Sequence, residues 1–203
     1  MNDDSKSLYS IGGATAILSG LLIVFSSYWF AFQDDHTVVH GLSVVMLILL
    51  VPTVVATTVL LNKDQRIGAL LGISFATLWI VMELIAHVSQ TAPLKTIKEI
   101  FPVTEGETPS DFEKVWQEWI TAFRLLGAFL FSISALCYAI ALRKWGNSAS
   151  SYLLIFAGIV FALTFIPYVD FNWHILVRGI AILFLGGVLL NAPSGTVSEE
   201  WEA

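Results

Sequence analysis

The chain has 203 residues, of which 56% are hydrophobic and only 13% are charged, and its mean hydropathy is +0.77. A soluble domain carries about twice that share of charge, roughly 25%. The composition therefore predicts an integral membrane protein and leaves too little polar chain for a separate soluble domain with its own core. The formal net charge is −6 and no basic block is present, so nucleic acid is not an expected partner.

Six apolar stretches predict an all-α, polytopic bundle of six transmembrane helices that forms a single membrane domain over residues 1–203. The expected helices cover residues 9–32, 37–61, 67–90, 111–142, 151–169 and 173–190. Pro52 should kink the second helix, because proline cannot donate the backbone hydrogen bond of a helix interior. Ser110 and Glu113 have the spacing of a capping box, which predicts that the fourth helix begins near Asp111.

The polar segments between these helices predict the topology. Residues 91–110 should form an extracytoplasmic loop with a short amphipathic interfacial helix, and residues 191–203 an acidic cytoplasmic tail. The lysines and arginines of the short loops fall on one side, whereas the turns after the first and fifth helices have none. The positive-inside rule then predicts that both termini are cytoplasmic and that the protein resides in the cell membrane, inner or plasma. The basic residues on this side are Lys6, Lys63, Arg66, Arg143 and Lys144.

Ionisable residues within the apolar stretches collect at one end of the expected bundle. His36/His40, Glu83/His87 and Asp170/His174 are each four residues apart, a spacing that puts both members on one helix face. All four histidines fall on the predicted extracytoplasmic side. Since a charge in hydrocarbon costs a few kcal/mol, about 2.5 or more, such residues are candidates for function.

Imidazole and carboxylate groups on facing helices are the usual ligands of transition metals in helical bundles. We therefore expect a polar pocket at the extracytoplasmic face that binds a metal ion or another small ligand. His40, Glu83 and His87 are its expected core, with His36 and His174 as further metal ligands. Arg124, Arg178 and Asp170 are the expected ligand-binding residues, the two arginines being able to meet an anionic ligand.

Three alternatives remain open at this point. The chain could be a structural or accessory subunit of a larger membrane complex, in which Glu83–Arg124 and Asp170–Arg178 are ordinary ion pairs. His40 and His87 could instead be axial ligands of a haem in an electron-transfer protein. A metal-dependent intramembrane hydrolase is the third alternative.

The sequence has no P-loop, no Rossmann glycine pattern, no GxSxG elbow and no HExxH, so we expect a protein that is not an enzyme. The expected partners are the lipid bilayer and either another membrane protein or a second copy of the chain.

Overall fold

The computed structural model describes residues 3–32, 37–91, 96, 99–100, 111–163 and 173–192. The described chain is helical and contains no β-strand, which confirms the predicted fold class. Its long elements are α1 (Asp3–Phe32), α2 (Thr37–Thr91), α4 (Asp111–Lys144), α5 (Ser148–Ala162) and α6 (Trp173–Leu190). α2 consists of two helices that meet at Gln65, whose φ of −141° and ψ of 47° are not helical. Counted separately, these two halves bring the number of long helices in the described residues to six.

The observed helices agree with the predicted ones except near some ends. α1 begins at Asp3 instead of residue 9, because its early acidic residues suit the positive end of the helix dipole. α4 begins at Asp111 as predicted and extends to Lys144, with two basic residues in its last turn. α5 begins earlier than predicted, since the Asn147 side chain accepts a hydrogen bond from the Ser150 backbone N–H at 3.1 Å and caps the helix.

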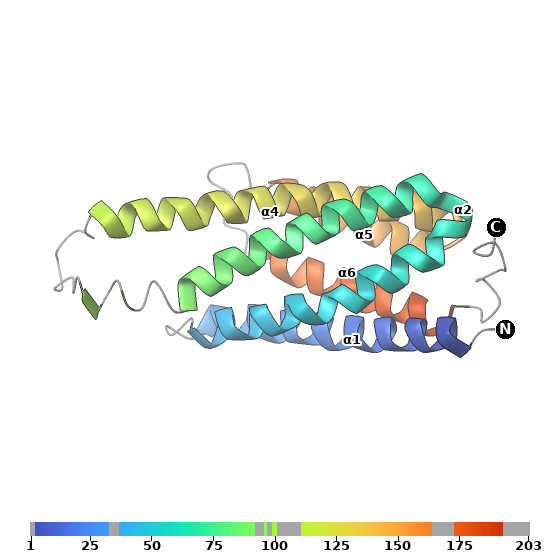
Figure 1. Ribbon diagram of the computed structural model, residues 1–203, viewed down its shortest axis with the longest axis horizontal. Helices are drawn as coiled ribbons and strands as arrows, with labels where there is room; N and C mark the ends of the chain where they lie inside the picture. The colour runs from blue at the N-terminus through green and yellow to red at the C-terminus, as the bar shows by residue number, and fades with distance from the viewer. Residues whose placement is uncertain are drawn as a thin grey trace.

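The second and third predicted helices correspond to the two halves of α2, which run in opposite directions (Figure 1). α2 remains helical through Pro52, and its break lies at Gln65, within the predicted polar hairpin. The interfacial helix falls mostly outside the described residues; of residues 92–110, only Thr96, Glu99 and Ile100 are described, all three as helical. Residues 193–203 of the predicted tail also fall outside them.

Four helical segments are long and apolar enough to cross a membrane: Asp4–Trp29, Val38–Asn62, Gln65–Thr91 and Asp111–Lys144. α5 and α6 are equally apolar but shorter. Large hydrophobic side chains on the outer faces of all these helices are exposed, for example Phe25, Ile48 and Phe184. An apolar exterior of this extent fits contact with lipid and not with water.

The helices form a closed ring, in which α1 packs against both α2 and α6, α2 packs against α4, α4 packs against α5, and α5 packs against α6. Glycines make several of these contacts very close. A methyl group added at Gly20 of α1 would lie 2.6 Å from Leu183 Cγ of α6, and one added at Gly72 of α2 would lie 2.7 Å from the Tyr138 ring of α4. Small residues allow this approach of two backbones, which drives helix association in lipid.

Hydroxyl groups link the helices through the interior. Thr58 of α2 and Tyr138 of α4 share a hydrogen bond of 2.8 Å, and Ser132 of α4 donates to the Gly158 carbonyl of α5 at 2.8 Å. These buried polar groups are satisfied between helices, so they fix the register of α4 against its neighbours.

Candidate functional site

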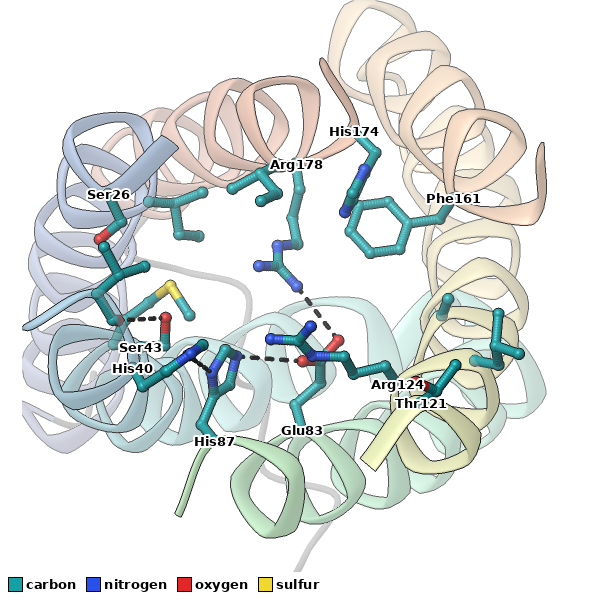
Figure 2. Close-up of a pocket in the computed structure, with 16 residues that line it drawn as sticks. Ser26, His40, Ser43, Glu83, His87, Thr121, Arg124, Phe161, His174 and Arg178 are labelled. Atoms are coloured by element: carbon teal, nitrogen blue, oxygen red, sulfur yellow. Dashed lines mark hydrogen bonds and ion pairs between the residues drawn. The ribbon is translucent and has the colours of Figure 1, made fainter. Parts of the chain in front are cut away.

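A cavity of about 330 Å³ lies within the ring, toward the end where α1 ends and α6 begins (Figure 2). All five long elements contribute to its walls. Its polar lining residues are Ser26, His40, Ser43, Glu83, His87, Thr121, Arg124, His174 and Arg178. The described members of the sequence-predicted site, His40, Glu83, His87, Arg124, His174 and Arg178, therefore line one space. His36 and Asp170 lie outside the described residues.

His40, His87 and Glu83 form a continuous polar chain along one wall of the cavity. The Nδ1 atoms of His40 and His87 are 3.1 Å apart, and His87 Nε2 is 3.4 Å from Glu83 Oε2. If His87 is neutral and its Nε2–H faces the carboxylate, its Nδ1 is the acceptor and His40 Nδ1–H is the donor. This assignment of tautomers satisfies both contacts without placing a charge on either ring.

Arg178 of α6 neutralises the Glu83 carboxylate. Its Nη1 atom is 3.6 Å from Glu83 Oε1, and both side chains are buried, with 6% and 9% of their surface exposed. The guanidinium carbon lies 5.6 Å from the centre of the Trp79 ring and 5.0 Å from that of Phe161. Such cation–π contacts stabilise a desolvated arginine by about 2 kcal/mol. Two aromatic rings and one carboxylate thus hold this charge inside the bundle.

The alternative of a structural subunit paired Arg124 with Glu83, but the structure gives Arg124 another partner. Its Nη2 atom donates a hydrogen bond of 2.8 Å to Gln90 Oε1, and its side chain is exposed at the edge of the cavity. The carboxylate of Glu83 pairs instead with Arg178. Arg124 on α4 lies nearer to the end of the bundle than Glu83 does. At that end, a long cationic side chain can reach a polar surface.

His174 is the residue of α6 one turn before Arg178, so both point into the cavity (Figure 2). Its ring meets that of Phe161 edge to face, with centroids 5.0 Å apart. The buried Nδ1 atom of His174 has no hydrogen-bond partner among the described residues, and neither has the buried Nε atom of Arg178. The buried Oγ atom of Ser26, which also lines the cavity, has no such partner either, so three polar atoms in one cavity are left for something other than the described chain to satisfy.

Three residues that sequence reasoning missed shape this site. Trp79 lies four residues before Glu83, so the same spacing rule that paired Glu83 with His87 could have found it. Phe161 and Gly127 gave no signal in the sequence, because their roles depend on how helices pack. A methyl group at Gly127 would lie 3.3 Å from Glu83 Cγ, so this glycine leaves the room that the carboxylate occupies.

The observed geometry does not fit a metal ion held by the predicted core. Among the described residues, no group of three or more His, Cys, Asp or Glu side chains is arranged to hold a metal. The physical reason is that His40 and Glu83 approach opposite nitrogens of the His87 ring, so no single point lies near all three.

A haem between His40 and His87 does not fit either. A haem iron bound to two axial imidazole nitrogens on opposite sides separates them by about 4 Å, because each metal–nitrogen bond is about 2 Å. Here the two Nδ1 atoms are 3.1 Å apart and bond each other directly. No macrocycle can lie between rings in this arrangement.

Comparison with models of protein families, with curated proteins and with solved structures finds no match for this chain. The chemistry of the cavity is therefore the basis on which a function can be assigned.

Proposed function

We propose that the chain is a small multi-pass membrane protein that binds a small ligand in the cavity at one end of its helical ring, without catalysing a reaction. The observation that carries this proposal is the cavity itself, which gathers buried Glu83, His87, His40 and Arg178 around about 330 Å³ of free space. Ligand pockets typically have about 300–1,000 Å³, an apolar lining and a few convergent polar groups. This cavity has each of these properties.

Six membrane-spanning segments are part of the proposal. α6 has 18 residues, about 27 Å at 1.5 Å per residue, which is close to the thickness of the hydrocarbon. Arg66 follows the break of α2 at Gln65, and Arg143 and Lys144 lie in the last turn of α4. This break and the end of α4 are at the end of the bundle where α1 begins, opposite the cavity (Figure 1). The positive-inside rule favours a cytoplasmic location for that end. The cavity would then open toward the extracytoplasmic face.

The first experiment is native mass spectrometry of the protein purified in mild detergent without a histidine tag. We expect an additional mass, in stoichiometric amount, that is released on denaturation. Ala128→Leu fills the cavity from α4 and should remove this mass, whereas Ala122→Leu on the exposed side of the same helix should retain it. A protein without additional mass, in which Ala128→Leu raises thermal stability, would contradict the proposal, because the leucine would then only fill an empty cavity.

A second candidate is a structural or accessory subunit, favoured by the buried ion pair between Glu83 and Arg178. In that case the pair serves only to fix α2 against α6, and the cavity has no occupant. The Ala128→Leu variant distinguishes the two candidates. If the ion pair is purely structural, the variant with the filled cavity should still copurify with its partner and keep its function in the cell.

A further inference from the structure

The Arg178 side chain has more hydrogen-bonding capacity than the described chain uses. A guanidinium carries five N–H donors, and the buried Nε donor has no partner among the described residues. The contact with Glu83 at 3.6 Å is longer than a charge-assisted hydrogen bond, which is about 2.7–2.9 Å. Because Arg178 as a whole is only 5% exposed, bulk water does not supply the hydrogen-bond acceptor that its Nε donor lacks. An acceptor atom that enters the cavity would therefore gain a strong interaction.

Charges around the cavity are not balanced. The described lining residues include two guanidinium groups, Arg124 and Arg178, but one carboxylate, Glu83. Gln90, which accepts the hydrogen bond from Arg124, is neutral. Among the described lining residues, guanidinium groups thus outnumber carboxylates by one, and an excess positive charge at the edge of hydrocarbon favours a counter-ion.

Much of the remaining lining is apolar. Ile23, Met46, Leu125 and Ile175 contribute aliphatic surface from four different elements, and Phe161 contributes an aromatic ring. A small inorganic anion would satisfy Arg178 but would leave this surface without a partner. A ligand that matches the whole cavity combines one acidic group with an apolar body.

We infer that the ligand is a monocarboxylate with an apolar tail, whose carboxylate oxygens accept hydrogen bonds from Arg178 and His174 while the tail lies against the aliphatic wall. This inference rests on the proposed ligand-binding function and adds the chemical class of the ligand. A carboxylate brings one negative charge, which equals the excess of guanidinium groups over carboxylates among the described lining residues, whereas a phosphate monoester brings about −1.5 to −2 at neutral pH. His174 Nδ1 can serve as a donor to the same group, since it has no partner among the described residues.

The test measures binding of sodium octanoate, 1-octanol and octyl phosphate to the purified full chain in a nonionic detergent. Tryptophan fluorescence is a suitable readout, because Trp79 lies directly against Arg178. We expect saturable binding of octanoate and at least tenfold weaker binding of the neutral alcohol and of the phosphate. Sodium butanoate and dodecanoate extend the series. A maximum at butanoate or octanoate indicates a water-soluble acid, and an affinity that still rises at dodecanoate indicates a fatty acid from the membrane.

Three variants test the position of the carboxylate. Arg178→Lys keeps the charge beside Glu83 but removes the Nε donor and the fork, so octanoate should bind about tenfold to a hundredfold more weakly. Arg143→Lys is the matched control, because Arg143 also contacts an aromatic ring, that of Tyr152, but lies at the far end of α4. It should leave the affinity unchanged. Glu83→Gln removes the negative charge that competes for Arg178, so octanoate should bind more tightly.

The outcomes separate this inference from the proposed function. Equal affinities for octanoate and octanol, unchanged by Arg178→Lys, would overturn the monocarboxylate inference while leaving a ligand pocket in place. Tighter binding of octyl phosphate than of octanoate would also overturn it. If none of these probes binds and the purified protein carries no additional mass, the proposed function itself is wrong.

Discussion

Loss of the Glu83 charge should destabilise the bundle because it leaves Arg178 buried without a counter-charge. The two groups are 3.6 Å apart, and both side chains are less than 10% exposed. At this distance, with an effective dielectric constant of about 20, the Coulomb energy of the pair is about 5 kcal/mol. Removal of one partner from a buried pair typically costs about 3–5 kcal/mol. We therefore expect Glu83→Gln to lower the free energy of unfolding by about 3–5 kcal/mol.

A double-mutant cycle distinguishes this effect from general damage at the site. Replacement of both partners removes the uncompensated charge, so Glu83→Gln combined with Arg178→Met should cost much less than the sum of the two single substitutions. Reversible unfolding in mixed detergent micelles gives the required free energies. Glu118→Gln, at an exposed position of α4, serves as the control and should change stability by no more than about 0.5 kcal/mol. Additive effects of Glu83→Gln and Arg178→Met would refute the ion pair as the source of stability.

Two further predictions concern packing between helices. Gly20→Ala places a methyl group 2.6 Å from Leu183 Cγ and 2.9 Å from the backbone of α6, so it should destabilise the protein by about 1–3 kcal/mol in thermal unfolding. At Gly187, nothing lies within 4 Å of an added methyl group, so Gly187→Ala should be neutral or stabilising by up to about 1 kcal/mol. An equal loss of stability in both variants would show that close packing is not the cause. Tyr138→Phe removes the 2.8 Å hydrogen bond to Thr58 and should cost about 1 kcal/mol; no change in the melting temperature would mean that the threonine hydroxyl finds an equally good partner.

The sequence predicted the helices well because their signals are local. Long uncharged runs, the polar hairpin around Gln65 and the capping box before Asp111 each act over a few residues. The part of the site that follows from spacing along one helix was equally accessible, as the contact between Glu83 and His87 shows. These relations need no knowledge of how helices pack.

Partners on different helices could not be assigned from the sequence. The alternative of a structural subunit paired Glu83 with Arg124, but depth along the bundle brings Arg178 to it instead. Likewise, three polar residues at suitable spacings do not make a metal site unless their atoms converge. In the structure they form a line, because His87 lies between His40 and Glu83.

The closed ring of helices has a consequence for assembly in the membrane. α6 emerges after α1, α2, α4 and α5 during synthesis, yet it completes the ring by packing against α1. It also carries Arg178, a charge that opposes transfer into lipid by about 2.5–3.5 kcal/mol at the centre of a helix. Glu83, together with the rings of Trp79 and Phe161, is already present when α6 arrives. The helices made before α6 therefore provide the surface on which it packs, and their carboxylate offsets much of the energy that its arginine requires.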